Sequence, residues 1–221
     1  ITFGEDDFRI IAAQPRFLVL SLRSQAIKCI LIAAHAPHTG ATLEEIETFW
    51  HNVSDQIPNR FDKWPRLMLA DANCRVGGHP DGRIGEWQSE GMHEKSEPFA
   101  HFVVRSDLFL PSTFEQYHQG VGGTWQHQSG KWKRNDYIGL PRSWALKNCT
   151  SWIPEEIDFS LQKEDHRTVC AEAAWSVYLN SNSHERKMRH RKGKPLIHEF
   201  CPARIAECAW HAHHDFTVDG H

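Results

Sequence analysis

An acidic and an amide side chain follow a short apolar run about a third of the way along the chain. Residues 67–69 (Leu-Met-Leu) lie between Pro65 and a polar loop, and so short a run favours a buried strand over a helix. In extended backbone, side chains two residues apart project from the same face, so Asp71 and Asn73 would project together. Their oxygens suit a hard cation such as Mg²⁺ and the phosphate it carries. Turns are also rich in Asp and Asn, so the pair gains meaning only if partners exist elsewhere.

Three further places put ionisable side chains at an expected strand end. His35 follows the apolar residues 28–34, Asp136 precedes residues 137–140, and Asp165-His166 precede residues 168–173. A cation ligand beside an imidazole can stabilise or protonate a phosphate oxygen. Asp136 is the natural candidate to orient that imidazole. Each residue alone is equally typical of a surface histidine or a turn. Their joint position at strand ends, where sites in layered sheet folds assemble, favours a function.

The elements that must position these side chains alternate between strand and helix patterns. Apolar runs predict strands over residues 17–22 and 28–34, joined by a turn at Ser24-Gln25. Three- and four-residue spacing predicts a helix over 42–57, with a capping box formed by Thr42 and Glu45 and a stop at Pro58. The strand over 66–73 and a turn-rich loop over 76–85 follow. A second helix is predicted over 96–105, then short strands over 108–110, 123–125, 137–140, 145–149 and 168–173.

The overall composition limits the class of protein. The 221 residues, 40% hydrophobic and 24% charged, predict one sizeable globular domain. A net charge of −3 argues against coating nucleic acid by bulk electrostatics, although it permits a local basic groove. The six cysteines include no Cys-x-x-Cys pair and predict reduced, mostly buried thiols. No signal peptide or membrane-length apolar stretch occurs, so we expect an intracellular monomer with no membrane partner.

Five motifs in order resemble the endonuclease/exonuclease/phosphatase family, over about residues 17–175. They are Ala34-His35-Ala36-Pro37, Leu69-Ala70-Asp71-Ala72-Asn73, Gly123-Thr124-Trp125, Arg134-Asn135-Asp136-Tyr137-Ile138 and Glu164-Asp165-His166-Arg167. Gly85-Glu86-Trp87 and Ser112-Thr113-Phe114 are similar to elements of the endonuclease domain of LINE-type retrotransposons. The resemblance implies an α/β fold, a four-layer α/β sandwich of two packed mixed β-sheets flanked by helices, over residues 1–175. It also implies Mg²⁺-dependent phosphodiester hydrolysis, with Mn²⁺ as an alternative ion, DNA as the substrate and a nuclear location.

The resemblance also implies a role for each matching residue. Asp71 would orient or activate the attacking water and, with Asp165, hold the metal ion. Asn73 would hold the phosphate, and His166, oriented by Asp136, would contact the scissile phosphate. His35 would be a second phosphate contact. The substrate-binding residues would be Asn73, Trp125 and Arg134.

The sequence departs from the family pattern before Phe17. Family members begin with a strand that carries an Asn and a second strand that ends in Gln-Glu, the Glu being the main metal ligand, and neither is found here. Smaller departures are Ala70 in place of Gly and Glu164 in place of Ser. The chain also begins without Met. We therefore expect a domain that is incomplete at its N-terminus and impaired in activity.

Two basic segments leave the substrate open. Lys131-Trp132-Lys133-Arg134 is typical of a nucleic-acid-contacting rim, and equally of a hairpin with solvated lysines beside one packed Trp. Residues 176–221 are expected to form a basic linker, with its charges over 184–194, and an appendage; a reverse transcriptase domain would follow. Cys201, Cys208, His211, His213 and His214 do not have a zinc-finger spacing. The alternatives to a nuclease are a phosphatase of the same fold and a non-catalytic remnant that at most binds nucleic acid.

Overall fold

The computed structural model of the protein describes residues 3–24, 27–145, 148–154 and 165–174. Gln25 of the expected turn, Glu164, the basic run over 184–194 and the cysteines and histidines after it lie outside these ranges. The strands are β1 (Phe8–Gln14), β2 (Phe17–Arg23), β3 (Lys28–His35), β4 (Arg66–Asp71), β5 (Leu108–Phe109), β6 (His118–Gln119), β7 (Trp125–Gln126), β8 (Trp132–Lys133), β9 (Asp136–Pro141), β10 (Cys149–Trp152) and β11 (Cys170–Ala173). The helices are α1 (Leu43–Asp55), α2 (Glu97–Arg105) and α3 (Arg142–Ala145), with short 3-10 turns between elements.

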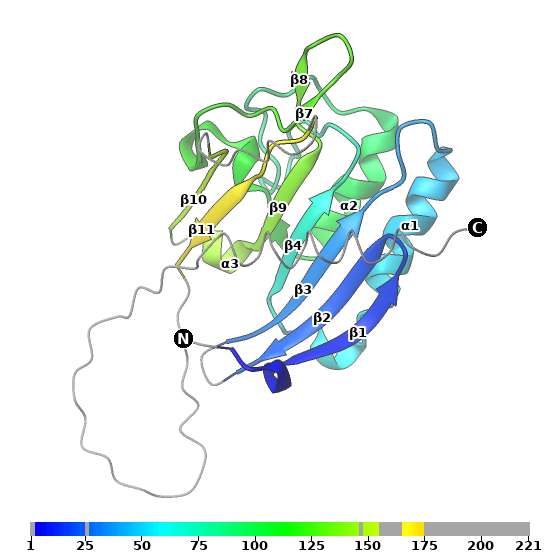
Figure 1. Ribbon diagram of the computed structural model, residues 1–221, viewed down its shortest axis with the longest axis vertical. Coiled ribbons are helices and arrows are strands. Elements are labelled where there is room, and N and C mark those ends of the chain that lie inside the picture. The colour runs from blue at the N-terminus through cyan, green and yellow to red at the C-terminus, as the bar shows by residue number, and fades with distance from the viewer. Residues whose placement is uncertain (1–2, 25–26, 146–147, 155–164, 175–221) are drawn as a thin grey trace, which may run out of the picture.

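A six-stranded mixed sheet in the order β1-β2-β3-β4-β9-β5 forms the centre of the fold. Only the β3–β4 pair is parallel, and α1 provides the crossover between these two strands. Helices α1 and α2 lie on one face of this sheet (Figure 1). Trp50 of α1 packs between the two helices, with its ring 4.9 Å from Phe99 and 4.8 Å from Phe102 of α2. This apolar layer extends to Met68 of β4 and holds the central strands rigidly.

A second, smaller sheet covers part of the opposite face. Its order is β11-β10-β6, with β10 antiparallel to β11 and parallel to β6. Cys149 of β10 belongs to an apolar cluster with Leu140 of β9, and Leu67 and Ile138 of the large sheet pack against that cluster. Two mixed sheets with flanking helices therefore form an α/β sandwich, the fold class that the sequence predicts.

Helix α1 shows how the local sequence sets an element boundary. The Thr42 hydroxyl accepts a hydrogen bond from the Glu45 backbone N–H at 3.2 Å, and the Glu45 carboxylate accepts one from the Thr42 N–H at 2.7 Å. Both free N–H groups are satisfied reciprocally, as the predicted capping box requires. The helix buries Trp50 and Val53 and ends at Asp55, shortly before Pro58. The predicted helix over 42–57 is thus confirmed within two residues at either end.

Two parts of the strand assignment were wrong or incomplete. Strand β1 was not predicted, because it lies at the edge of the sheet, exposes Phe8 and Ile10, and contains a bulge between Ile10 and Ala12 that breaks the alternation. The strand predicted over 145–149 was placed too early: Ala145 ends the helical turn α3, residues 146–147 lie outside the described ranges, and β10 begins at Cys149. No helix among the described residues is long and apolar enough to span a membrane.

Candidate active site

Three neighbouring strands of the large sheet carry ionisable side chains side by side: His35 is the last residue of β3, Asp71 is the last of β4, and Asp136 is the first of β9. His35 pairs with Asp71 in the β3–β4 register, and Asp71 pairs with Asp136 in the β4–β9 register. His35 Nε2 lies 3.8 Å from Asp71 Oδ2. Like charges directly opposite each other on adjacent strands are destabilising. The fold nevertheless places Asp71 opposite Asp136. Tolerance of an unfavourable pair of this kind is typical of a functional site.

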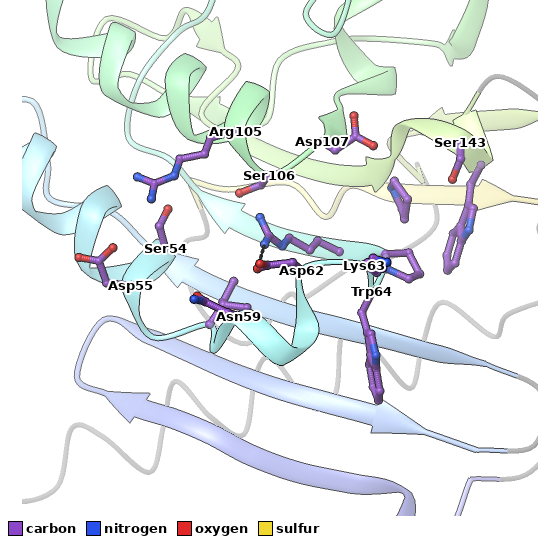
Figure 2. A pocket seen from close by; sticks show the side chains of 15 residues that line it. Ser54, Asp55, Asn59, Asp62, Lys63, Trp64, Arg105, Ser106, Asp107 and Ser143 are labelled. Atoms are coloured by element: carbon purple, nitrogen blue, oxygen red, sulfur yellow. Dashed lines mark ion pairs between the residues drawn. The ribbon is translucent and has the colours of Figure 1, made fainter.

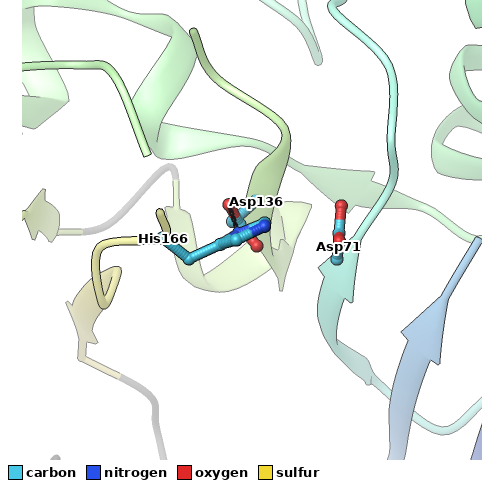
Figure 3. A group of neighbouring side chains, drawn as sticks. All are labelled: Asp71, Asp136 and His166. Carbon is cyan, nitrogen blue, oxygen red and sulfur yellow. Dashed lines mark hydrogen bonds and ion pairs between the residues drawn. The ribbon is translucent and has the colours of Figure 1, made fainter. Parts of the chain in front are cut away.

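His166 joins these residues from a segment thirty residues after Asp136 in the chain. Its backbone forms a bridge with Trp125, and its Nδ1 lies 3.0 Å from Asp136 Oδ2. One ligand atom from each of Asp71, Asp136 and His166 lies within 4.8 Å of the others. Figure 3 shows the imidazole over Asp136, with the Asp71 carboxylate facing them from the end of β4. Residues that are up to 95 positions apart in sequence therefore form one cluster.

The cluster changes the proton affinities of its members. Burial, and next the charge of Asp136, raise the pKa of Asp71 to about 6, although the backbone N–H of Asn73 opposes the change. Burial by itself would lower the pKa of His166, but the hydrogen bond and charge of Asp136, with smaller contributions from Asp71 and Asp165, outweigh it and raise that pKa. The Asp71 carboxylate, with its raised pKa, thus lies next to the His166 imidazole, which stays protonated to a higher pH than usual. Such a pair of shifted pKa values is typical of sites that perform acid–base chemistry.

Asn73 lies at the turn that follows β4. Its φ of 48° is in the left-handed region that Asn tolerates better than most residues. The backbone N–H of Asn73 donates to Asp71 Oδ1 at 2.9 Å, and Nδ2 donates to the carbonyl of Ala36 at 2.8 Å. These bonds fix the side chain between the ends of β3 and β4. The amide oxygen is left as the acceptor or ligand atom beside Asp71.

The donor set fits a divalent cation. Two carboxylates from adjacent strands converge, and a positive ion between them would relieve the repulsion that raises the pKa of Asp71. The structure brings Asp71 together with Asp136 and His166 rather than with Asp165, the second predicted metal ligand. Asp165 Oδ2 instead accepts a hydrogen bond from Trp125 Nε1 at 3.0 Å. Among the described residues, Asp71 and Asp136 are therefore the carboxylates best placed to hold a divalent cation.

The two remaining predicted substrate residues have different surroundings. Trp125 is half-buried beside His166, with ring centroids 6.5 Å apart. Arg134 is only 7% exposed. Its Nε donates to the carbonyl of Gly122 and its Nη1 to that of Trp87, both at 3.1 Å, and its guanidinium lies over the Trp87 ring. Arg134 thus holds loops together at the base of the β7–β8 hairpin, and the exposed cation of this hairpin is Lys131.

Sequence reasoning missed the contribution of Thr124. Its buried Oγ1 accepts hydrogen bonds from the backbone N–H groups of Asn135 and Asp136, both at 3.0 Å. The carbonyl of Asn135 in turn accepts from the N–H of Ala72, next to Asp71. Thr124 belongs to the Gly-Thr-Trp motif, so the motif pointed to this position but not to the role of the hydroxyl.

A large cavity lies away from this cluster. It has a volume of about 860 Å³ and is lined by Arg66, at the start of β4, and by Asp62, Arg105 and Ser106, among others. Figure 2 shows the side chains that line it. Because Arg66 begins β4 and Asp71 ends it, the cavity lies at the opposite end of this strand from the cluster. Its lining mixes charges of both signs, with Arg66 3.9 Å from Asp62. None of Asp71, Asp136 and His166 lines this cavity, so we do not assign it to the candidate active site.

Comparison with known proteins supports the fold. No family model matches the chain, and neither does any curated protein sequence. The 3′-5′ exonuclease NExo from Neisseria meningitidis has a TM-score of 0.53 and 16% identity over 76% of this chain and 71% of its own. The endonuclease domain of TRAS1, a telomere-specific non-LTR retrotransposon, has a TM-score of 0.47 and 13% identity, covering 76% and 67%. A mannosyl-6-phosphatase from Bacteroides thetaiotaomicron has a TM-score of 0.49 and 14% identity, covering 78% and 69%. The structures that resemble this chain include endonuclease/exonuclease/phosphatase family proteins, and the likeness to NExo shows that the chain shares the fold of that exonuclease.

Proposed function

We propose that the cluster of Asp71, Asp136 and His166 hydrolyses phosphodiester bonds in DNA with Mg²⁺, or alternatively Mn²⁺. The observation that carries this proposal is the register of β3, β4 and β9, which places two carboxylates opposite each other and beside an imidazole held by one of them. Phosphoryl chemistry needs these parts: a group that handles water, a site for a cation and a donor for the phosphate.

Each residue has a task that its surroundings support. With a pKa of about 6, the Asp71 carboxylate is ionised at pH 7.5 and basic enough to orient water and accept its proton. His166 binds Asp136 through Nδ1, which leaves Nε2 to donate to a phosphate oxygen. The Asn73 amide positions phosphate and water, and His35, 3.8 Å from Asp71, is a second phosphate contact. A bound cation would neutralise the negative charge that grows on the phosphate oxygens.

DNA is the substrate that surrounding features favour. The hairpin of β7 and β8 contacts the cluster through the Trp125–His166 bridge and carries Lys131 and Trp132. The Arg167 guanidinium lies 3.5 Å above the Trp132 ring. Cations and aromatic rings of this kind contact phosphates and bases. A second structure of NExo, described as a 3′ phosphatase, contains a bound product DNA hairpin and has a TM-score of 0.51 with this chain. The retrotransposon type of endonuclease, with a reverse transcriptase domain as its neighbour in a longer nuclear protein, rests on the sequence motifs.

We expect slow turnover from this stretch of chain by itself. The family's Gln-Glu pair does not occur in the 221 residues, and strand β1 before Phe17 carries neither that pair nor an Asn. Without that Glu, the cation would be held by fewer carboxylates and bound more weakly. We therefore expect activity only at millimolar metal concentrations.

The test is nicking of supercoiled plasmid with and without Mg²⁺ or Mn²⁺. Nicking should require the metal and should disappear in Asp71→Ala and in His166→Ala. Matched controls are Asp55→Ala and His51→Ala, because both residues are exposed on α1 and carry no role in the site. Nicking that survives either site substitution would assign the activity to a contaminant and refute the proposal.

The same protein distinguishes the two alternatives. A phosphatase of this fold would release phosphate from a small phosphomonoester in the presence of metal and leave the plasmid intact. A non-catalytic remnant would show neither reaction and would bind DNA with an affinity that falls as salt rises.

A further inference from the structure

The two segments that carry the catalytic cluster from the C-terminal half of the chain are attached to the same pair of residues. Asp136 begins β9, and His166 lies in a short stretch thirty residues later. Thr124 and Trp125 make hydrogen bonds to both segments. The geometry of the Asp136–His166 contact therefore depends on a third place in the sequence.

Thr124 fixes the start of β9 through its side chain. The residue is 1% exposed, and its Oγ1 accepts from two successive backbone N–H groups, those of Asn135 and Asp136, at 3.0 Å each. A hydroxyl oxygen has two lone pairs and can accept both bonds. A methyl group in the same place would leave the two N–H groups without this acceptor, which is costly for buried backbone.

The backbone around Thr124 and the ring of Trp125 fix the segment that carries His166. The N–H of Arg167 donates to the carbonyl of Thr124 at 2.6 Å, and the N–H of Gln126 donates to the carbonyl of Asp165 at 2.7 Å. Trp125 forms the backbone bridge to His166. Its Nε1 also donates to the Asp165 carboxylate at 3.0 Å. Both sides of His166 in the chain are thus held by residues 124–126.

We propose that Thr124 and Trp125 are positioning residues that hold Asp136 and His166 in the mutual orientation needed for phosphodiester hydrolysis. This inference rests on the proposed function for its kinetic consequence. The Thr124 hydroxyl fixes the backbone position of Asp136 at the start of β9. The Thr124–Arg167 and Trp125–His166 contacts fix the position of the His166 imidazole relative to the Asp136 carboxylate. The Trp125 indole N–H additionally restrains the Asp165 carboxylate beside the site. Trp125 thereby acts through its neighbours rather than by contacting the substrate.

The decisive comparison is Thr124→Val against Thr124→Ser. Valine keeps the shape and removes the acceptor, whereas serine keeps the hydroxyl. Thr124→Val should lower kcat at least about tenfold, because displacement of a reacting group by about 1 Å can cost up to about a hundredfold. KM should remain within about twofold, since the residue touches no substrate. Thr124→Ser should restore most of kcat. Trp125→Phe, which removes only the indole N–H, should lower kcat less than Thr124→Val does.

A matched control separates positioning from general stability. Thr113 is also fully buried, with its hydroxyl bonded to the backbone of Gly85 and Leu110, and it lies on a turn that carries no site residue. Thr113→Val should lower Tm as much as Thr124→Val or more while leaving kcat unchanged. Equal losses of kcat in the two valine variants would overturn the proposal, and so would a wild-type kcat in Thr124→Val.

Amide hydrogen exchange tests the coupling without any turnover. Thr124→Val should speed exchange at the amides of Asn135 and Asp136, which lose their acceptor, and also at Arg167, whose own acceptor carbonyl is unchanged. Faster exchange at Arg167 shows that the two segments move together. Faster exchange confined to Asn135 and Asp136 would refute the positioning role. This measurement remains decisive if the wild-type protein proves inactive on every substrate, a result that would count against the proposed function alone.

Discussion

At the scale of single residues, the ionised carboxylates of the candidate site lower the stability of the folded protein. Asp71 and Asp136 face each other across two strands, and burial adds to their repulsion, so that the pKa of Asp71 is about 6. A carboxyl group whose pKa is higher in the folded state than in the unfolded chain destabilises the fold once it ionises. We propose that Asp71 persists for what its charge does, namely the handling of water and a cation.

Replacing Asp71 with Asn should therefore stabilise the protein at neutral pH and abolish hydrolysis. Asn can still accept the hydrogen bond from the backbone N–H of Asn73. With a pKa of about 6 against about 4 when unfolded, the gain at pH 7.5 is at most about 3 kcal/mol. Urea unfolding of metal-free protein measures it. The gain should shrink as the pH falls from 6 to 4, because the wild-type carboxyl is then protonated. A gain that persists at pH 4 would contradict this account.

The pH dependence of activity should be bell-shaped, with both sides of the bell governed by Asp136. Activity falls on the acidic side as Asp71 is protonated, at or below the pKa of about 6 that Asp71 has without a bound cation. It falls again above the raised pKa of His166 as the imidazole loses its charge. Asp136 raises both pKa values. Asp136→Asn should therefore shift both sides of the profile to lower pH, besides reducing kcat.

Two measurements check the shifted profile. The pH dependence of kcat/KM is recorded for wild type, Asp136→Asn and the control Asp55→Asn, which alters an exposed carboxylate on α1. The His166 ring protons are titrated by NMR in metal-free protein, where Asp136→Asn should lower the pKa. A shift of only one side of the profile would show that Asp136 acts on one partner alone.

At the scale of elements, the long loop after β4 is fixed by close backbone approach. The N–H of Gly85 donates to Thr113 Oγ1 at 2.8 Å, and the N–H of Trp87 donates to the Thr113 carbonyl at 3.0 Å. A Cβ at Gly85 would lie 2.3 Å from the carbonyl oxygen of Thr113. The loop can therefore pack here only with glycine at this position.

Gly85→Ala should destabilise the protein by about 1–3 kcal/mol, the usual cost of forcing an extra methyl into packed structure. The matched control is Gly4→Ala, because a Cβ at Gly4 would meet nothing within 4 Å and should change stability by less than about 0.5 kcal/mol. Thermal unfolding of both variants is the measurement. Equal Tm values for the two would show that the loop is not held against Thr113.

The sequence predicted those elements whose local pattern agrees with their tertiary role. Strands β2, β3 and β4 and helices α1 and α2 lie where apolar spacing, the capping box and Pro58 place them. Strand β1 escaped prediction because an edge strand buries only one residue, Ala12, and contains a bulge. The strand predicted over 145–149 was placed too early because the chain first makes a helical turn after Pro141, and β10 begins at Cys149.

The candidate site was predictable as a set of residues but not as an arrangement. The residues predicted for the site lie at or near the same ends of β3, β4 and β9; they are His35, Asp71, Asn73, Asp136 and His166. The pairing of Asp71 with Asp136 follows from the β4–β9 register, which depends on long-range contacts that single-sequence patterns do not contain. For the same reason, the burial of Arg134 and the hydrogen bonds of Thr124 could not be foreseen, since both depend on loops distant in sequence.

At the scale of the whole molecule, the two sheets should differ in stability. The large sheet is packed under α1 and α2, and Cys74, just after β4, is buried in that apolar layer. Cys29 of β3 is completely buried in a separate apolar cluster of the same sheet, with Leu22 and Ile27. The small sheet has three short strands and contributes Cys149 and Cys170. Segments with fewer buried apolar contacts open at lower free energy. The four thiols therefore report on the opening of two different layers.

Thiol labelling should reveal this order. Burial raises the pKa of Cys29 and Cys74 to about 12 and that of Cys149 to about 11, so none forms the reactive thiolate at pH 8 while folded. In a variant with Cys201→Ser and Cys208→Ser, a thiol reagent should give no fast phase, and mass spectrometry should find Cys149 and Cys170 modified before Cys29 and Cys74. Labelling in urea, where all four should react together, is the control. Simultaneous slow labelling in native buffer would mean that both sheets open as one unit, and early labelling of Cys29 would reverse the expected order.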